Sequence, residues 1–512
     1  MSKVVRLSEL EKTGWGESIV GATVCFGHFN IIHPGHVRHF RTAVTYGSPL
    51  VVAVEGDSQL PEIHRDSVFP EEERAQALGA IDLVDFVVIL DSGNLKDFVD
   101  RARISTLVLG REFESTRAET VAPAIESFRN RGGIVVFDPG ETHYASSELL
   151  YGSPGDLEKH RWQAFTRVLK TQNISLDKVF KVMEASQRPH ILVVGDVILD
   201  RYVACDPIGM SNEAPVVVVK ELETQDYVGG AGIIAAHVAA LGSKSTIFSV
   251  VGRDDQGEFI EQSLRDLGVE TILVRDEGRP TTLKTRFLVE NQKLFRVSRL
   301  KEHSLSQENE DALIGEIERY AKGADGILVS DFVYGVITKR LLNALRSLSV
   351  EYGIPLFGDL QCSSQIGNIL KFEQFFLICP TEKEARIALG NHDDGVEYIA
   401  NLLIQRAQSE NTVVKLGSEG FISYLSRQDK DAFLHRQHFP ALTANPADVT
   451  GAGDALLAAM ATGLTRGLSM MEVSALACLV SAIAVQTVGN RPISLNQVQQ
   501  YYRQHKLVNE AE

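Results

Sequence analysis

The chain has 512 residues, of which 44% are hydrophobic and 23% charged, and its formal net charge at pH 7 is −16. This length exceeds what one hydrophobic core normally organises and predicts two to four domains. The acidic surplus repels phosphate backbones and anionic lipids, which argues against nonspecific nucleic-acid binding and membrane-surface binding.

The first third of the chain alternates apolar strand patterns with helix patterns. An apolar run over residues 18–26 leads into a glycine turn and a helix, which is the usual opening of a nucleotide-binding α/β domain. Helices are expected over residues 71–81 and through Phe128. Further strands are expected over residues 49–57, 84–90, 105–110 and 133–137. Because the strands are continuous apolar runs, they predict a doubly wound parallel sheet covered on both faces.

Residues 151–189 form a turn cluster followed by a charged, helix-favouring segment, which predicts a helical connector rather than a flexible linker. A second α/β unit begins near residue 190, where strands such as GILVSD, IPLFGD, FFLICP and NTVVKLG recur with helices between them. The partly alternating runs 282–290 and 292–300, together with VVVVK at 216–220, predict a small half-exposed sheet. The expected domains are therefore 1–150, 151–189 and 190–512.

Several features favour a cytoplasmic protein. The N-terminal stretch MSKVVRLSELEK contains no apolar core of the kind found in a signal peptide. The apolar stretch 475–488 is too short to span a bilayer, and we expect a buried helix there. The cysteines form no C-x-x-C pair, which favours free thiols in a reducing compartment. They are Cys25, Cys205, Cys362, Cys379 and Cys478.

Two histidines follow the first strand in the run HPGH. The i, i+3 spacing puts His33 and His36 near one helix entrance, with Gly35 keeping the turn tight. There they can donate hydrogen bonds to a phosphate on the helix N-terminus and stabilise the charge that develops when one phosphate attacks another. A pair of surface histidines and a metal pair are the alternatives, although local spacing supplies no third zinc ligand.

A Gly-rich turn opens a small-residue helix in DVTGAGDALLAA, residues 448–459. Gly451, Ala452 and Gly453 can direct backbone N–H groups at one point, and the helix N-terminus behind them makes that point an anion site. The carboxylate of Asp454 beside it suits a base that accepts a proton from a hydroxyl attacking a phosphoryl group. A plain helix-entry turn is the alternative.

The run GHFNIIHPGH, residues 27–36, resembles the signature of the HxGH nucleotidyltransferases, the superfamily of cytidylyl- and adenylyltransferases. The resemblance covers residues 19–150, includes ASSELL near its end, and implies a Rossmann-like domain that uses ATP or CTP. It implies that His33 and His36 are catalytic. It also implies nucleotide contacts from Gly27, Phe29, Asn30, Arg74, Arg111, Ser146 and Ser147.

Some positions depart from that family. Asn30 stands where relatives usually have Asp, and Leu109 stands where sugar-nucleotide relatives have Lys. No lysine occurs in the segment before Arg74, where relatives supply one for the triphosphate, and His64 and Arg65 are the nearby cationic candidates. These departures leave two interpretations open, a rearranged phosphate site and a domain with weakened activity.

Residues 190–507 resemble the ribokinase-like sugar kinases, most closely the kinase half of bifunctional heptose-phosphate kinase/adenylyltransferases. Five motifs carry the resemblance: GDVILDRY, SNEAPVVVVK, VGGAGIIAAHVAALG, SDFVYG and DVTGAGDA. It implies a ribokinase-like fold with a small β lid, Mg²⁺ and ATP as cofactors, and Asp454 as the base for the sugar hydroxyl. It places ATP along Gly451, Ala452, Gly453, Lys415, Gly417 and Gly420, with magnesium held through water by Glu384. It places the sugar against Asp196, Asp200, Gly229, Gly230 and Asp331; loop and helix capping is the alternative for Asp196 and Asp200.

The kinase half also departs from its relatives. Ile233 stands where relatives place an Asn that reads sugar hydroxyls, and Thr381 replaces the Asn of the N-x-x-E motif. GDLQ, residues 358–361, stands in place of D-P-K-G, so Asp359 can replace the Asp while the lysine is lost. The kinase comes second in this chain and first in the familiar heptose enzymes. These changes predict an altered sugar specificity, because a buried hydroxyl loses its partner.

The sequence therefore predicts an α/β protein with two doubly wound parallel-sheet domains and two activities in nucleotide-activated sugar synthesis. One domain phosphorylates a sugar or sugar phosphate, for which a heptose phosphate is a candidate. The other joins a sugar or polyol phosphate to a nucleoside monophosphate and releases pyrophosphate. The alternative is a sugar kinase fused to a degenerate nucleotide-binding regulatory domain. Expected partners are small molecules and a second copy of the chain, without nucleic acid or membrane.

Overall fold

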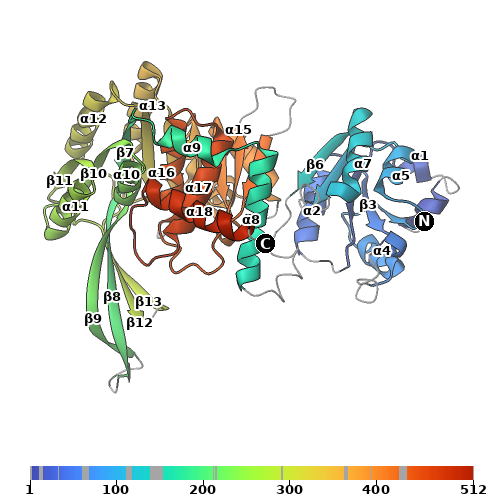
Figure 1. Cartoon of the computed structure of the whole chain (residues 1–512), viewed down its shortest axis with the longest axis horizontal. Helices are drawn as coiled ribbons and strands as arrows, with labels where there is room; N and C mark the ends of the chain where they lie inside the picture. The colour runs from blue at the N-terminus through green and yellow to red at the C-terminus, as the bar shows by residue number, and fades with distance from the viewer. Residues whose placement is uncertain are drawn as a thin grey trace. The chain divides into compact units, whose positions relative to one another are not determined.

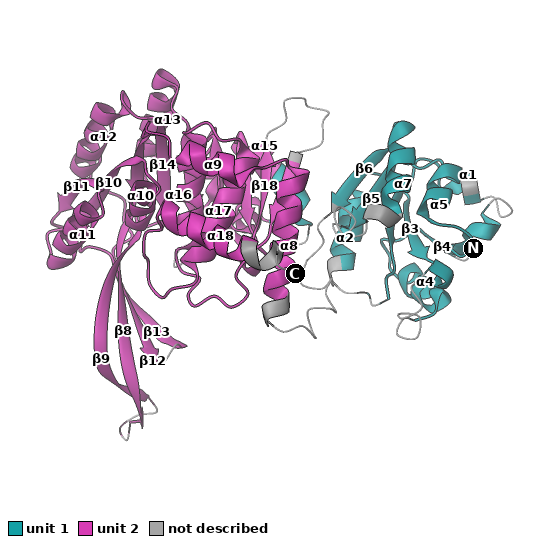
Figure 2. Ribbon diagram, in the orientation of Figure 1, with its two compact units in different colours: residues 1–151, 391–401 teal, residues 152–390, 402–512 magenta. Residues whose placement is uncertain are grey.

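The computed structural model describes residues 3–10, 15–30, 32, 34–59, 69–110, 118–138, 154–211, 213, 216–289, 292–361, 367–391, 394–425 and 435–510. The chain folds into two compact α/β units (Figure 1). One comprises residues 1–151 with 391–401, and the other comprises residues 152–390 with 402–512 (Figure 2).

The first unit contains a six-stranded sheet in the order β1-β4-β3-β2-β5-β6, and every pairing in it is parallel. The strands are β1 (Val4–Arg6), β2 (Thr23–Gly27), β3 (Leu50–Glu55), β4 (Phe86–Leu90), β5 (Thr106–Gly110) and β6 (Ile134–Asp138). The chain moves outward from β2 in one direction through β3 and β4, and in the other through β5 and β6. The carboxyl ends of β2 and β5 therefore form the switch point at which such sheets bind ligands.

Both faces of this sheet are buried, as predicted. Val24 and Phe26 of β2 belong to one hydrophobic cluster, whereas Cys25 between them belongs to another cluster on the opposite face. The sequence did not predict β1, a short edge strand. The strand expected from residue 18 begins at Thr23 because α1 precedes it. The helices are η1 (Leu7–Glu9), α1 (Trp15–Ser18), α2 (Pro34–Val44), η2 (Asp57–Gln59), α4 (Glu71–Gly79), α5 (Leu95–Arg101) and α7 (Ala118–Asn130).

The second unit is built on a nine-stranded sheet in the order β11-β10-β7-β14-β15-β16-β17-β18-β19. The strands from β11 to β17 pair in parallel, and β18 and β19 complete the edge in antiparallel fashion. The strands are β7 (His190–Gly195), β10 (Lys244–Gly252), β11 (Glu270–Asp276), β14 (Gly326–Asp331), β15 (Leu356–Leu360), β16 (Leu377–Ile378), β17 (Asn411–Lys415), β18 (Phe421–Leu425) and β19 (His435–Phe439). This sheet confirms the predicted α/β class.

A four-stranded lid projects from this sheet within the same unit (Figure 1). Its order is β13-β12-β8-β9, and its strands are β8 (Val197–Met210), β9 (Val217–Gly230), β12 (Leu283–Val289) and β13 (Gln292–Arg299). The run HILVVGDVILDRY is thus divided, with β7 in the main sheet and β8 in the lid. Alternate residues of β12 are buried, whereas β13 is exposed throughout. The lid therefore has one covered face and one open face, which is the half-exposed sheet predicted.

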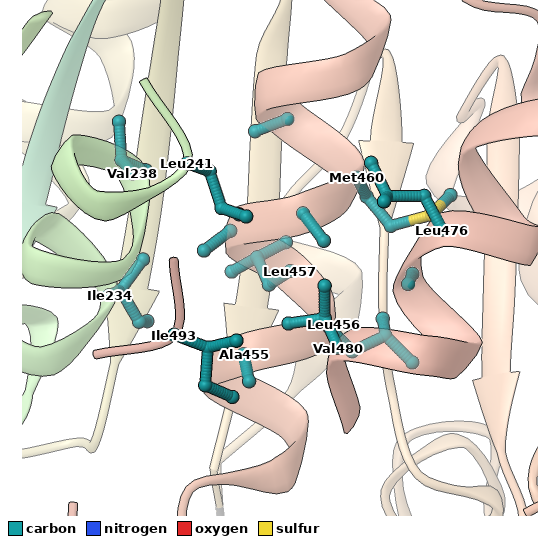
Figure 3. Close-up of a cluster of buried hydrophobic side chains, with 14 of the residues drawn as sticks. Ile234, Val238, Leu241, Ala455, Leu456, Leu457, Met460, Leu476, Val480 and Ile493 are labelled. Carbon is teal, nitrogen blue, oxygen red and sulfur yellow. The ribbon is translucent and has the colours of Figure 1, made fainter. Parts of the chain in front are cut away.

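Small and apolar residues pack three helices of the second unit into its core. Figure 3 shows Ile234 and Val238 of α10 on one side of α16, with Leu476 and Val480 of α17 on the other. Leu457 of α16 lies between them and is fully buried. All the helices described between residues 152 and 512 are α8 (Pro154–Thr171), α9 (Leu176–Met183), α10 (Ala231–Ala240), α11 (Asp255–Asp266), α12 (Gln307–Ala321), α13 (Lys339–Tyr352), η4 (Ile369–Lys371), α14 (Glu382–Leu389), α15 (Val396–Ala407), η5 (Gly417–Glu419), α16 (Ala452–Leu464), α17 (Met470–Ala484) and α18 (Leu495–Glu510).

The apolar stretch near residue 480 is the buried helix α17, as expected from its length. Within the described part of the chain, no helix is long and apolar enough to cross a membrane. Four cysteines, Cys25, Cys205, Cys379 and Cys478, are buried free thiols, and Cys362 lies outside the described residues.

Candidate active sites

The carboxyl ends of the parallel strands in the second unit collect polar side chains from distant parts of the chain. Asp359 and Gln361 lie at the end of β15, Lys415 ends β17, and the first turn of α16 brings Asp454 to them. Since these strands are parallel, their carboxyl ends share one edge of the sheet, where ligands bind in such folds.

The turn before α16 has the geometry of an anion site. Gly451 caps the helix with φ +81°, a left-handed conformation that favours glycine. A Cβ on Gly451 would lie 2.6 Å from Asn490 Oδ1, so a side chain would also collide there. The N–H groups that follow belong to a 13-residue helix, whose N-terminus attracts negative charge.

Asp454 is 4% exposed, and its Oδ1 accepts a hydrogen bond of 2.6 Å from Gln361 Nε2. Burial raises the pKa of Asp454 to about 7. Lys415 and Lys284 oppose this rise by favouring the charged form, and Asp200 adds to it. A carboxyl with a pKa near neutrality is suited to accept a proton from an attacking hydroxyl.

Lys415 and Asp359 form a buried ion pair, with 2.6 Å between Nζ and Oδ2. Burial raises the pKa of Asp359 to about 7, although the ammonium opposes the rise. The pKa of Lys415 is held above its ordinary value because Asp359 and Glu384 outweigh the effect of burial. The ammonium is therefore charged at neutral pH.

A cavity of about 410 Å³ lies against the α16 turn. Apolar side chains such as Leu442 and Val485 form one part of its wall, and glycines form another, as suits a nucleotide base and its phosphates. The residues predicted to lie along ATP all line this cavity: Lys415, Gly417, Gly420, Gly451, Ala452 and Gly453. Their binding roles stay predictions.

Glu384 lines the same cavity, and its Oε2 accepts a hydrogen bond of 2.8 Å from the Thr381 backbone N–H. The Thr381 hydroxyl in turn accepts a hydrogen bond of 3.2 Å from the Glu384 backbone N–H, so the pair forms the capping box of α14. The described residues contain no group of three or more His, Cys, Asp or Glu side chains placed to hold a metal. One carboxylate beside the phosphate site fits Mg²⁺, which keeps several waters and is carried chiefly by nucleotide phosphates.

A second cavity of about 420 Å³ lies between the lid and Asp454. Gln361 and Gly451 line both cavities, so this second cavity, the predicted sugar cavity, adjoins the first, the predicted nucleotide cavity. The lid strands supply four cations to its wall: Lys284, Arg286, Lys293 and Arg296. The sequence analysis missed this set. The alternation of the strand pattern was a usable signal, because Lys284 and Arg286 are two positions apart and therefore share the covered face of β12.

Neighbouring groups hold the lid cations in place. The ammonium of Lys284 lies 4.9 Å from the ring centroid of Phe332, a cation–π geometry. Lys293 Nζ lies 2.7 Å from Asp448 Oδ1, which ties the lid to the turn before α16. The Tyr202 hydroxyl donates to the other oxygen of Asp448 at 2.9 Å.

Two of the five predicted sugar-binding residues, Asp200 and Gly230, line this cavity. Asp200 accepts a hydrogen bond of 2.8 Å from Asn490 and pairs with Arg286. Gly229 packs directly against the Asp200 carboxylate, where a Cβ would overlap Oδ2. Gly229 therefore allows the lid strand to approach Asp200 without itself facing the cavity.

Asp196 and Asp331 lie behind the cavity wall. Asp196 accepts backbone hydrogen bonds from Phe332 at 2.9 Å and from Val336 at 3.3 Å, so it holds the loop that follows β14. Asp331 pairs with Lys371 and accepts from the Val333 backbone N–H at 2.7 Å. The geometry of Asp196 favours the capping alternative over direct sugar contact.

Ile233 does not line the sugar cavity, contrary to the expectation that this position faces the sugar. It is 1% exposed and belongs to the hydrophobic core of α10. An apolar side chain suits that position, because an unpaired amide in the core would be costly. Asn490, which the sequence analysis missed, supplies an amide to the cavity from a segment near the C-terminus.

The first unit places its motif at the switch point of the sheet. Gly27 ends β2, and His36 lies in the first turn of α2. Phe29 has φ +50°, and its ring packs edge-on against His36 with 5.1 Å between centroids. Asn30 Oδ1 accepts a hydrogen bond of 2.7 Å from the Phe69 backbone N–H. The other residues predicted for this site lie outside the described residues: His33, Arg111, Ser146 and Ser147.

Arg74 is buried, and its guanidinium bonds to groups of the protein itself. Nη1 donates to His28 O at 2.6 Å, Nε donates to Phe69 O at 2.8 Å, and Nη2 donates to Glu55 O at 2.9 Å. Nη2 also lies 2.6 Å from Asp57 Oδ1. Arg74 therefore braces the loops around the switch point, and its geometry does not support the predicted phosphate contact.

Two family profiles match separate parts of the chain. The pfkB family of carbohydrate kinases matches residues 188–496, more than half of the chain, and the cytidylyltransferase-like family matches residues 24–142. Among solved structures, phosphofructokinase-2 from Escherichia coli has a TM-score of 0.52 at 18% identity and covers 62% of this chain and 99% of that chain. This similarity confirms the predicted fold of the kinase region.

Two curated relatives are each named "Bifunctional protein HldE". The protein from a Nitratiruptor species is 31% identical over 321 residues, and the one from Trichlorobacter lovleyi is 33% identical over 307 residues. These matches cover 62% and 59% of this chain and 65% and 60% of the relatives, which is less than two thirds of each relative. The chain is therefore an enzyme that belongs to the pfkB family of carbohydrate kinases and also carries a cytidylyltransferase-like domain.

Proposed function

We propose that this bifunctional enzyme acts in nucleotide-activated sugar synthesis and that its kinase domain, residues 190–512, phosphorylates a sugar phosphate. The charge of the sugar cavity carries the proposal. Four cations of its wall, Lys284, Arg286, Lys293 and Arg296, outnumber three carboxylates, which are Asp200 and Asp454 in the wall and Asp448 paired with Lys293. In a chain with a net charge of −16, this local positive excess favours an anionic sugar.

The proposed kinase step transfers the terminal phosphoryl group of ATP to a sugar hydroxyl. Asp454 takes the proton of that hydroxyl, and the N–H groups at residues 451–453 bind the phosphoryl oxygens. Glu384, which lines the nucleotide cavity, would hold magnesium through water, and the ion would supply positive charge to the nucleotide phosphates. A heptose phosphate is the first substrate to test, because the sequence resembles the heptose-phosphate kinases in five ordered motifs.

The N-terminal domain, residues 1–150, is proposed to transfer a nucleoside monophosphate from ATP or CTP to a sugar or polyol phosphate. Pyrophosphate is the second product. The position of His36 at the sheet's switch point supports this reaction, because phosphates bind there in doubly wound folds. His33 and His36 would stabilise charge on the attacked phosphate.

One observation favours the alternative in which this domain binds a nucleotide without turnover. Arg74, the arginine that the resemblance assigns to phosphate, is bonded to four groups of the protein. With the triphosphate lysine also missing from the sequence, the domain has fewer cations for the pyrophosphate product.

Separate assays of ADP and pyrophosphate test both activities in one protein. We expect Asp454→Ala to lower ADP formation by about 10²- to 10⁴-fold, as for loss of a general base, with pyrophosphate release unchanged. The double variant His33→Ala/His36→Ala should lower pyrophosphate release and leave ADP formation unchanged. In each variant, the activity that is retained shows that the protein is folded. Unchanged ADP formation in Asp454→Ala would refute the kinase proposal. No pyrophosphate from the wild type with any nucleotide would favour the regulatory alternative.

We also propose that the enzyme is a homodimer that pairs through the lid. Ribokinase-like relatives often pair through this small sheet. The outer part of β8 and β9 exposes apolar side chains: Ile208, Met210, Val217 and Leu222. Strand β9 is the edge of the lid, and an apolar edge strand is a surface that proteins normally cover.

A further inference from the structure

Two side chains at the end of β15, Asp359 and Gln361, each bind a charged group of the candidate kinase site. Asp359 binds the ammonium of Lys415, and Gln361 binds the carboxylate of Asp454, each at 2.6 Å. Both side chains belong to GDLQ, the segment that lacks the lysine expected from the heptose kinases. A lysine from a different strand, β17, thus stands beside this segment.

The ammonium of Lys415 lies against the predicted anion site. A Cβ on Gly453 would lie 3.2 Å from Lys415 Nζ, so the ammonium lies against the first turn of α16. Lys415 and Gly453 both line the nucleotide cavity. The side chain of Lys415 is 11% exposed and that of Asp359 is fully buried, so few waters weaken the field of this charge.

We propose that Lys415 is a catalytic residue whose ammonium binds the phosphoryl group in transfer, and that Asp359 positions it. This inference rests on the proposed kinase function. A buried ion pair with no further role is commonly replaceable by apolar residues without loss of stability. A positive charge beside a transferring phosphoryl group does have a function. It stabilises the negative charge that the equatorial oxygens carry in the transition state.

Phosphoryl transfer requires no change in the protonation of Lys415. The sugar oxygen forms a bond to the γ-phosphorus as the bond from that phosphorus to the β–γ bridging oxygen breaks. The hydroxyl proton passes to Asp454, and ADP leaves with the electron pair of the broken bond. Lys415 keeps its proton and hydrogen-bonds a γ-phosphate oxygen throughout.

A single substitution of Lys415 would leave Asp359 buried without its partner and could unfold the protein. The test therefore compares two variants that share a neutral residue 359, Asp359→Asn and Asp359→Asn/Lys415→Met. The two variants differ only in the presence of the Lys415 ammonium. Thermal unfolding of both shows whether each is folded at the assay temperature.

We expect kcat for ADP formation to fall less than about 10-fold in Asp359→Asn, with a higher KM for ATP, because the ammonium is present but less firmly held. In Asp359→Asn/Lys415→Met, kcat should fall by about a further 10²- to 10³-fold, as when one transition-state donor is removed. Equal kcat values in the two folded variants would overturn the proposal, because the pair would then be structural.

Nucleotide binding provides a test that does not depend on the sugar. Titration calorimetry with ADP and with a non-hydrolysable ATP analogue measures how much the terminal phosphate adds to affinity. That gain should be about 10-fold smaller in Asp359→Asn/Lys415→Met than in Asp359→Asn, about 1.4 kcal/mol. An unchanged gain would refute contact with the terminal phosphate. Failure of the wild type to form ADP with any sugar phosphate would instead refute the proposed kinase reaction.

Discussion

At the scale of single residues, Asp454 is balanced between groups that favour its charged form and groups that oppose it. Burial and Asp200 raise its pKa, whereas Lys415, Lys284 and the Gln361 amide lower it. Because the result lies near 7, a modest change at any neighbour moves the base across the physiological range.

Replacing Gln361 with alanine should move the pH dependence of the kinase. The lost hydrogen bond stabilised the carboxylate, so the pKa of Asp454 rises above about 7. The base must be deprotonated to act, and activity therefore rises with pH through this pKa. We expect the acidic limb of kcat/KM for the sugar to shift to higher pH by about one unit, since one such bond contributes about 1 kcal/mol.

The matched control is Gln262→Ala, because Gln262 is an exposed glutamine of α11. Its pH profile should match that of the wild type. An acidic limb in Gln361→Ala that coincides with the wild-type limb would contradict a role for Asp454 as the titrating base.

At the scale of elements, α16 reaches the active site because its small residues allow close packing along its whole length. Its first turn carries Asp454, and its last turn meets α17 at Gly463. A Cβ on Gly463 would overlap Val473 Cγ2 of α17. The packing of one end of the helix therefore fixes the position of the base at the other end.

Two glycine-to-alanine substitutions separate this packing from helix propensity. Gly463→Ala should lower the free energy of unfolding by about 1–3 kcal/mol, because the added methyl overpacks the contact between α16 and α17. Gly315 lies within α12, and a Cβ there would meet nothing within 4 Å. Gly315→Ala should therefore raise the free energy of unfolding by about 0.5–1 kcal/mol. Urea denaturation measures both, and a stabilised Gly463→Ala variant would contradict the close contact.

At the scale of the whole molecule, the lid has two distinct parts. Strands β12 and β13 carry the cations of the proposed sugar cavity, and the far end of β8 and β9 exposes apolar side chains. If a second chain covers that end, dimer formation restrains the strands that hold Lys284 and Arg286. We therefore expect assembly and sugar affinity to be coupled.

Sedimentation of charged lid variants tests the dimer. The wild type should sediment at twice the chain mass of 56.3 kDa, and Ile208→Asp/Leu222→Asp should sediment at the chain mass. The added carboxylates would be desolvated in a lid contact, which is unfavourable. Val350 on α13 is 85% exposed, so Val350→Asp serves as a matched control and should stay dimeric. A monomeric wild type would contradict the proposal.

The sequence predicted most elements from local information, although it missed β1 and placed the start of β2 too early. Strand and helix periodicity identified both parallel sheets, and the GAGD run identified the helix start that carries Asp454. The composition of residues 475–488 likewise predicted the buried helix α17. These features depend on neighbours within a few residues, so they can be read from the sequence.

The surroundings of individual side chains were decided by the tertiary structure. Resemblance placed Ile233 at the sugar and Arg74 at a phosphate, but the packing of the domains put one in the core and the other in a backbone network. The contacts that define the kinase site join residues far apart in the chain. Lys415 and Asp359 are 56 positions apart, Lys293 and Asp448 are 155 apart, and Asn490 and Asp200 are 290 apart.

The sequence alone thus determined the family and the two folds, and it predicts Asp454 as the general base. Only the tertiary structure decided which cations surround that base and which cavity they face. The physical reason is that a motif sets local backbone geometry, whereas burial and charge at a site are set by every segment packed against it. Lys415 of β17 lies beside Asp359 of GDLQ, a pairing that the order of residues along the chain does not reveal.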